Sequence, residues 1–162
     1  MPIIHLVTEI NAPIERCFDL SRSIDLHLLS TSQTNEKAIA GVTKGLIGPD
    51  QEVTWRARHL GIYQNLTSRI TAYDYPNYFE SKMQKGAFKK IDHRHVFEQK
   101  DGHTIMKDHF DFEAPLGIIG KIVSRLFLFS YMKTLLEIRN RTIKQVAESE
   151  QWKLLLNKDS SI

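Results

Sequence analysis

The sequence predicts an α+β domain in which a curved antiparallel sheet packs against one long C-terminal helix. Three observations support this fold class. Apolar and polar residues alternate between about residues 52 and 113, helical spacing then continues to about Glu148, and an N-terminal strand pattern is followed by two short helical patterns. Strands grouped before a long helix favour α+β over a parallel α/β fold. A helix on a curved sheet need not fill the space beneath it, so a cavity is expected.

The composition fits one globular domain. The chain has 162 residues, of which 41% are hydrophobic and 25% are charged, and its formal net charge is +3. This length is enough to bury a sizeable core, and the near balance of charges lacks the basic excess typical of nucleic-acid binding. We expect a single domain over residues 1–150, a tail at 151–162, and no nucleic-acid partner.

Cysteine usage and hydropathy indicate the cellular compartment in which this protein is expected. Cys17 is the only cysteine, which favours a reducing compartment, and its place on an apolar helix face predicts an inert buried thiol. The first ten residues resemble a strand and lack the basic and apolar segments of a signal peptide. The most apolar window, residues 118–138, carries Lys121, Arg125 and Lys133, so we expect no stable membrane insertion. These features predict a cytoplasmic protein and leave the oligomeric state open.

The N-terminal elements follow from turn and capping residues. β-Branched residues predict a strand over Ile3–Ile10, which ends at a turn before Pro13. Proline suits the first turn of a helix, and Ser23 is a typical N-cap for a second short helix. Three glycines and a proline in residues 41–50 indicate turns around a short edge strand.

The central strands follow from a period of two. Residues 52–70 predict two strands that turn at Leu60-Gly61, with Trp55 and His59 on the inward face. Residues 78–84 predict a third strand that carries Phe79 and Met83 on one side.

Residues 92–112, "DHRHVFEQKDGHTIMKDHFDF", predict a hairpin with its turn at Asp101-Gly102. Paired residue numbers then sum to 203, so His95 faces Asp108 and His93 faces Phe110. One face is mostly charged and is expected to meet solvent. The opposite face is expected to point inward; it carries His93, His95, Phe97, Met106, Asp108 and Phe110.

The inward His93, His95 and Asp108 allow three interpretations. A buried carboxylate needs a partner, and directly opposite residues in a hairpin are close enough to pair. The group can orient a ligand as polar points in a cavity wall, transfer a proton as an acid/base pair, or bind a metal through two imidazoles and a carboxylate. We favour the first interpretation and predict neither a metal nor a cofactor.

Three segments carry a resemblance to a known family. "EINAPIERCFDL", "VTWRARHLGIYQNLTSRI" and "GAFKKIDHRHVFEQKDGHTIMKDHFDFEAPLGIIGK" resemble the SRPBCC superfamily of START-like helix-grip proteins, which includes birch-pollen-allergen and polyketide-cyclase types. The chain looks like the bacterial ligand-binding members, some of which are labelled cell-division inhibitors. The resemblance covers roughly residues 3–148 and includes the motifs Trp55-x-Ala57-x-His59 and His93-x-His95-x-Phe97. It implies a helix-grip fold with a deep pocket between the sheet and the C-terminal helix.

The resemblance implies binding of a lipid, a polyketide or a similar hydrophobic metabolite. We expect such a ligand to contact the inward sheet face and the long helix: Trp55, His59, Leu66, Phe79, Met83, His93, His95, Phe97, Met106, Asp108, Phe110, Ile119, Val123 and Phe127. Two alternatives remain: a cyclase or dehydratase-like enzyme that uses His95 and Asp108 for proton transfer, and a protein-interaction module of the same fold. The sequence contains no motif that favours catalysis.

Overall fold

The computed structural model describes residues 2–114 and 125–157. Seven antiparallel strands form one sheet in the order β1-β7-β6-β5-β4-β3-β2, so β1 and β2 are its edges. The strands are β1 (Ile3–Ile10), β2 (Lys37–Gly41), β3 (Glu52–His59), β4 (Ile62–Asp74), β5 (Tyr78–Lys85), β6 (Lys90–Lys100) and β7 (His103–Glu113).

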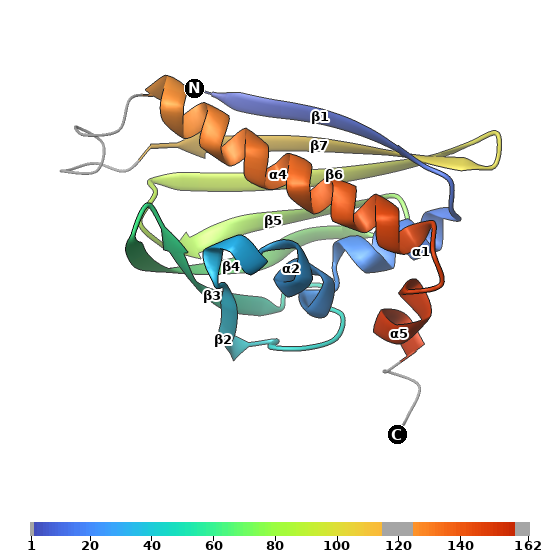
Figure 1. The fold of residues 1–162 in the computed structure, drawn as a ribbon, viewed down its shortest axis with the longest axis horizontal. Helices are drawn as coiled ribbons and strands as arrows, with labels where there is room; N and C mark the ends of the chain where they lie inside the picture. Colours follow the sequence, from blue (N-terminus) through green and yellow to red (C-terminus); the bar gives the residue numbers. More distant parts are fainter. Residues whose placement is uncertain (1, 115–124, 158–162) are drawn as a thin grey trace.

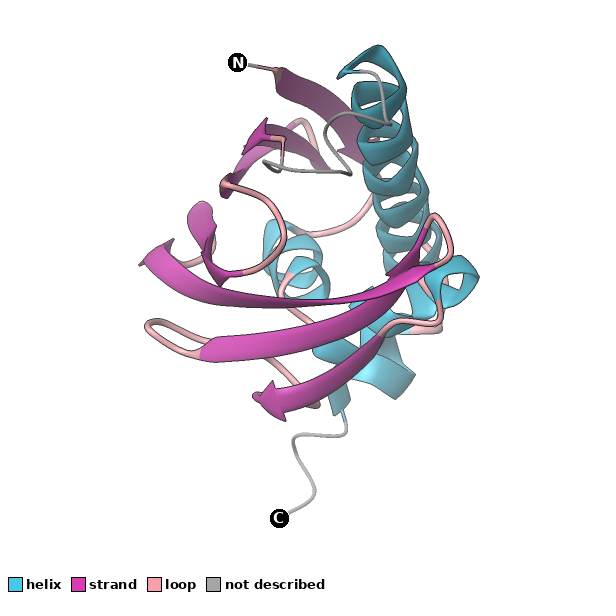
Figure 2. Cartoon of the chain, turned by 90° about the vertical axis from the view of Figure 1, so that its left-hand side faces the viewer, coloured by secondary structure: helices cyan, strands magenta, loops and turns pink. Residues whose placement is uncertain are grey.

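The helices cover one face of this sheet. They are α1 (Ile14–Ser21), α2 (Ile24–Ser30), the 3₁₀ turn η1 (Ser32–Thr34), α4 (Arg125–Ala147) and α5 (Trp152–Leu156). Figures 1 and 2 show the sheet curving around the long helix α4, with α1 and α2 beside it. The predicted curved sheet, long C-terminal helix and two short helices after the first strand are therefore confirmed.

Turn geometry confirms the predicted register of the β6–β7 hairpin. Asp101 (φ 49°) and Gly102 (φ 81°) both adopt left-handed backbone conformations, as a type I′ turn requires. His95 lies opposite Asp108 and His93 lies opposite Phe110, as predicted. Because side chains alternate between faces, this register places both histidines and Asp108 on the concave face.

The apolar core has two parts. The larger part lies under α1 and the C-terminal half of α4, where the Phe18 ring lies 5.2 Å from that of Phe79 and 5.3 Å from that of Phe97. The smaller part joins Phe110 and Phe112 of β7 to the N-terminal half of α4. Polar residues and cavities occupy the space between α4, α2 and the middle of the sheet.

The rotation of α4 differs from the prediction. Leu128, Leu136 and Ile143 face the sheet and are buried, whereas Phe127 is 49% exposed. Apolar residues occur on several sides of the N-terminal part of this helix, so spacing alone did not identify the buried side. Ile119 and Val123, also predicted to contact a ligand, lie outside the described residues.

The predicted tail contains a short helix that packs back on the domain. Trp152 of α5 lies under the guanidinium of Arg16, with 4.0 Å between the charged carbon and the ring centroid. Leu155 and Leu156 contact the larger core. Among the described residues, no helix has both the length and the apolar character needed to cross a bilayer.

Candidate functional site

A cluster of buried polar side chains joins the β6–β7 hairpin to α4. We call His93, His95, Asp108, Arg139 and Asn140 the buried polar cluster. Asp108 Oδ1 accepts a hydrogen bond from His93 Nε2 at 2.7 Å, and its Oδ2 accepts one from Asn140 Nδ2 at 2.6 Å. The side chain of Asp108 is fully buried, so these donors replace the water that a carboxylate otherwise requires.

Arg139 is the cation of this cluster. Its Nη2 donates to the carbonyl of Ser21 at 2.8 Å, while its Nη1 lies 3.9 Å from Asp108 Oδ1. His95 Nδ1 also lies 3.1 Å from that oxygen, but it has no hydrogen bond of acceptable direction, so we treat the approach as electrostatic. Both of the helical residues that reach Asp108 come from one turn of α4.

Burial and pairing fix the charges in the cluster. Burial lowers the pKa of His93, and it lowers that of His95 to well below the usual range, with the neighbouring His93 adding to the effect. Burial alone would raise the pKa of Asp108, but the hydrogen bond from His93 and the close approach of His95 hold it well below its ordinary value. The stable state is an Asp108 carboxylate beside two neutral imidazoles and the Arg139 guanidinium.

The same residues come close to a metal-binding geometry. One ligand atom from each of His93, His95 and Asp108 lies within 4.8 Å of the others. However, the Arg139 guanidinium already supplies a positive charge 3.9 Å from Asp108, and it would repel a cation at this point. This charge arrangement disfavours the metal interpretation.

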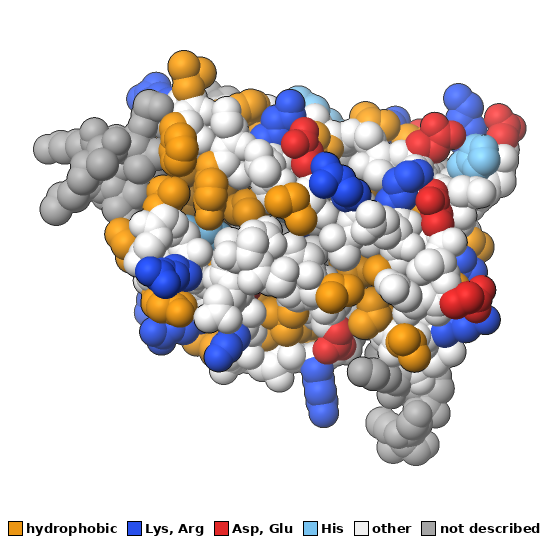
Figure 3. All heavy atoms as spheres, viewed as in Figure 1, with side chains coloured by type: hydrophobic (Ala, Val, Ile, Leu, Met, Phe, Trp, Pro, Cys, Tyr) orange, Lys and Arg blue, Asp and Glu red, His pale blue; other side chains and the backbone are white. Residues whose placement is uncertain are grey.

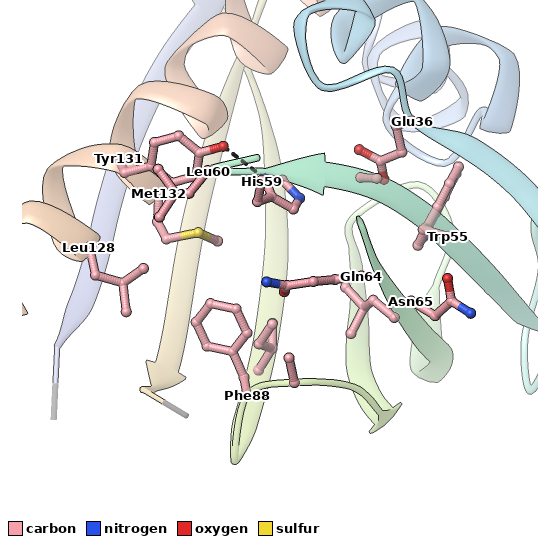
Figure 4. A pocket seen from close by; sticks show the side chains of 14 residues that line it. Glu36, Trp55, His59, Leu60, Gln64, Asn65, Phe88, Leu128, Tyr131 and Met132 are labelled. Atoms are coloured by element: carbon pink, nitrogen blue, oxygen red, sulfur yellow. Dashed lines mark hydrogen bonds between the residues drawn. The ribbon is translucent and has the colours of Figure 1, made fainter. Parts of the chain in front are cut away.

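An apolar cavity, the outer cavity, lies between the sheet, the N-terminal half of α4 and the β5–β6 loop (Figure 4). Its volume is about 100 Å³. His59 Nδ1 and the Tyr131 hydroxyl form a 2.8 Å hydrogen bond that links the end of β3 to α4 beside it. The lining residues are Glu36, Trp55, Ala57, His59, Leu60, Gln64, Asn65, Leu66, Ala87, Phe88, Ile91, Leu128, Tyr131 and Met132.

A second cavity, the inner cavity, lies between the middle of the sheet, the α1–α2 junction and Arg139 of α4. Its volume is also about 100 Å³. Its lining is more polar than that of the outer cavity: Ser21, Arg22, Ser23, Ile24, His27, Ile47, Val53, Trp55, Ser68, Ile70, Phe79, Ser81, His93, His95 and Arg139.

Trp55 borders both cavities. His27 stacks on the Trp55 ring at a centroid distance of 4.1 Å, and its Nε2 lies 3.0 Å from Glu36 Oε1. The stacked pair therefore stands where the apolar and polar parts of the interior meet.

Of the twelve predicted site residues that the structure describes, six line these cavities. Trp55, His59 and Leu66 line the outer cavity, while Phe79, His93 and His95 line the inner one. Asp108 lies directly behind the two histidines, and the Phe110 ring lies 5.1 Å from that of His93.

Four predicted wall residues lie elsewhere. Phe97 and Met106 are buried in the larger core because α1 covers that part of the sheet, and Ser21 Oγ of α1 lies 3.4 Å from Met106 Sδ. Met83 packs against the smaller core. None of these three lines the outer or the inner cavity, and neither does the half-exposed Phe127.

The sequence reasoning missed Arg139, Asn140, Glu36 and Tyr131. The sequence does contain a feature that marks the first two. Arg139 and Asn140 lie three and four residues after Leu136, on the same helix face as Leu136 and Ile143, so they are polar residues on a buried face. A polar pair inside an apolar helix face indicates a buried partner. Glu36 lies in a polar loop, where no spacing pattern marks it.

The fold is shared with solved structures of low sequence identity. TTHA0849 from Thermus thermophilus superposes with a TM-score of 0.69 at 18% identity, over 91% of this chain and 100% of that one. A START superfamily protein from Mycobacterium smegmatis gives 0.65 at 13% identity, over 90% and 97%. The chain has the START-like helix-grip fold.

A plant protein shares this START-like fold. Ginseng major latex-like protein 151 from Panax ginseng gives a TM-score of 0.65 at 17% identity, over 91% of this chain and 98% of that one. No family model matches the chain, and no curated protein matches it in sequence. At such identities the likeness shows the fold and not the chemistry, so function has to be argued from the cavities.

Proposed function

We propose that the chain binds a hydrophobic small molecule, such as a lipid or a polyketide, in the interior between the sheet and α4. One observation carries this proposal: the outer cavity is lined mainly by apolar side chains, with a few polar groups at separate points. Small-molecule sites have this character, because apolar contacts supply affinity and sparse polar groups fix orientation. Burying about 200 Å² of apolar ligand surface contributes roughly 5 kcal/mol before the costs of association.

We also propose a cellular location for this protein. We place the chain in the cytoplasm as a single domain, without a nucleic-acid partner. The free buried thiol of Cys17, whose pKa is raised by burial, and the modest net charge of +3 support this.

Filling the outer cavity tests the proposal. Ala57 is buried and lines this cavity, so Ala57→Leu places three more carbons in it. We expect affinity for 1-octanol, followed by Trp55 fluorescence in a Trp152→Phe background, to fall at least tenfold. Ala40→Leu, on the exposed edge strand β2, is the matched control. Native mass spectrometry of gently purified protein should also reveal a co-purified small molecule.

The proposal fails if 1-octanol does not bind the parent protein. It also fails if Ala57→Leu folds normally and binds 1-octanol as well as Ala40→Leu does, because the ligand would then lie outside this cavity.

Proton transfer on a polyketide-like substrate is a second proposal, and one observation favours it. His95 lines the inner cavity with the Asp108 carboxylate 3.1 Å behind it, so it is placed to take a proton from a ligand there, although its lowered pKa makes it a weaker base than a free histidine. Hydrogen–deuterium exchange at carbon 3 of octane-2,4-dione would report such a base. Acceleration by the protein that His95→Gln abolishes would support catalysis; equal exchange with and without protein would exclude this reaction.

The interaction-module alternative rests on exposed apolar side chains. Figure 3 shows such side chains gathered over the N-terminal half of α4, where Leu126 is 82% exposed; Leu60 and Ile62 of the β3–β4 hairpin are about half exposed. That alternative expects a tightly packed interior, whereas this interior holds two cavities. We therefore favour ligand binding.

A further inference from the structure

The inner cavity has an unusual charge pattern for the interior of a protein. Its lining contains two arginines, three histidines and four serines, and no aspartate or glutamate among the described residues. Asp108 lies behind this lining and does not reach it, because His93 and Asn140 occupy both of its oxygens. Among the described residues, the charged side chains of this lining are therefore arginines, and its other polar groups are mainly serine hydroxyls and imidazoles.

Arg139 is the central donor. It is 8% exposed, and its charge is balanced only at a distance, because the nearest Asp108 oxygen lies 3.9 Å away, beyond hydrogen-bond reach. Its recorded hydrogen bonds go to the Ser21 carbonyl at 2.8 Å and the Asn140 side chain at 3.5 Å, both neutral acceptors. A guanidinium has five N–H donors, so this one retains capacity for an anion.

Two hydroxyl groups add to this capacity. Ser68 of β4 and Ser81 of β5 line the inner cavity, and within the described part of the chain neither hydroxyl has a hydrogen-bond partner. Half-buried hydroxyls without a protein partner are available to a ligand. Arg22, the other lining arginine, is already paired with Asp19 at 2.8 Å.

The outer cavity, in contrast, disfavours an anionic group. Glu36 is its one lining carboxylate among the described residues, and its other walls are mostly apolar. An anionic group would be repelled by Glu36 there, whereas Arg139 in the inner cavity would attract it. An apolar chain suits the outer walls (Figure 4), and Trp55 borders both spaces.

We propose that the inner cavity binds the acidic head, a carboxylate or a comparable anion, of an amphipathic ligand whose apolar body occupies the outer cavity. The inference rests on the proposed function and narrows it to one class of ligand. Arg139 is the principal contact of the head, with Ser68 and Ser81 as further donors. Asp108 acts as a positioning residue, because it accepts a hydrogen bond from Asn140, whose Oδ1 in turn lies 3.5 Å from Arg139 Nη1.

Three probes of eight carbons each test the head preference. Octanoate, whose eighth carbon is the carboxyl carbon, 1-octanol and octylammonium carry heads of different charge and can be titrated at neutral pH against Trp55 fluorescence in the Trp152→Phe background. We expect octanoate to bind about tenfold more tightly than 1-octanol, and octylammonium to bind most weakly. A tenfold difference in affinity corresponds to the free energy that a hydrogen bond to a charged group typically contributes.

Arg139→Met removes the charge and keeps the length of the side chain. We expect the ratio of octanoate to 1-octanol affinity to fall to about one. Arg141→Met is the matched control, since Arg141 lies on the same helix and is exposed, and it should keep the tenfold ratio. Should Arg139→Met fail to fold, as judged by circular dichroism, Ser81→Leu carries the test. That change fills the inner cavity without altering charge and should weaken octanoate at least tenfold.

Equal affinity of the parent protein for octanoate and 1-octanol would overturn the inference and leave the proposed function standing. A preference for octanoate that survives both Arg139→Met and Ser81→Leu would overturn it as well, because the head would then bind elsewhere. Failure of all three probes to bind would overturn the inference and the proposed function together.

Discussion

At the level of single residues, Asp108 links the sheet to the long helix through buried polar contacts. Its carboxylate joins strand β6, through His93, to helix α4, through Asn140, and it is the nearest counter-charge of Arg139. A buried ion pair adds little net stability when it forms, but losing one partner leaves the other charge buried and uncompensated. The cluster therefore depends on each of its members.

Replacing the carboxylate tests this dependence. We expect Asp108→Asn to lower the free energy of unfolding by about 3 kcal/mol, because it keeps the size of the side chain but leaves Arg139 without a counter-charge. Urea denaturation measures the change. Asp111→Asn on the same strand is the control; its partially exposed pair with Lys90 should contribute less than about 1 kcal/mol. Equal effects of the two changes would contradict this account.

The buried histidines predict a pH dependence of stability. Burial holds the pKa of His93 and His95 below the unfolded value of 6.5, so the unfolded chain takes up protons first as the pH falls. Their contribution is complete above pH 6.5 and is lost below it, at up to about 1.4 kcal/mol per pH unit for each group until its folded pKa is reached. Protonation of Asp108 does not enter this window, because its pKa is held below 3.8.

His95→Gln should reduce this slope. Urea unfolding at a series of pH values from neutral to mildly acidic is the measurement, and we expect the variant to lose about half of the decline. The control is His109→Gln, an exposed residue on the other face of the hairpin, outside the buried polar cluster. A slope that does not change in His95→Gln would show that another group titrates.

At the level of elements, the β6–β7 hairpin fixes which side chains face the cavities. Its two-residue turn sets a register in which His93, His95 and Asp108 share one face, and a shift by one residue would turn all three to solvent. Gly102 supports this turn with φ 81°.

Gly102→Ala isolates the backbone contribution to the turn. A Cβ atom at Gly102 would meet nothing within 4 Å, so any loss reflects the left-handed conformation alone. We expect thermal or urea unfolding to show a loss of about 1 kcal/mol. Gly48→Ala, where the backbone is not left-handed and the added Cβ would meet the Gln51 side chain at 3.2 Å, is the comparison and should cost less than Gly102→Ala if that side chain shifts. A neutral result at Gly102 would argue that the turn relaxes without cost.

The long helix α4 provides the opposite wall. Leu128 and Met132 border the outer cavity, and Arg139 borders the inner cavity further along the helix. A rotation of α4 would exchange these residues for exposed ones such as Lys133. The helix therefore determines both the shape and the charge of the interior.

At the scale of the whole molecule, a hollow interior has a consequence for stability. The outer and inner cavities of about 100 Å³ each separate α4 from the middle of the sheet. Missing contacts on one side of a cavity wall cost stability, and a ligand that fills the space restores them.

Ligand binding should therefore raise the melting temperature. At octanoate concentrations near 100 times its Kd, linkage adds about 2.7 kcal/mol to the free energy of unfolding. For a domain of this size we expect an upward shift of several degrees, measured by differential scanning calorimetry. Ala57→Leu should show a much smaller shift at the same concentration. An equal shift in this variant would indicate binding outside the outer cavity.

The parts of this protein that depend on local rules can be predicted from the amino-acid sequence alone. Alternation with a period of two identified β3 to β7, and Asp101-Gly102 fixed the register that turns His93, His95 and Asp108 inward. Such features need only neighbouring residues, because backbone conformation and strand pairing at a tight turn are set locally.

The contacts that other elements make with these residues depend on the tertiary structure. Asn140 reaches Asp108 from 32 positions further along the chain, and its contact depends on the rotation and placement of α4. The stack of His27 on Trp55, which stands between the apolar and polar cavities, likewise joins α2 to β3. Packing between elements set these contacts, because local spacing specifies which face of an element is apolar but not which residues of another element will lie against it.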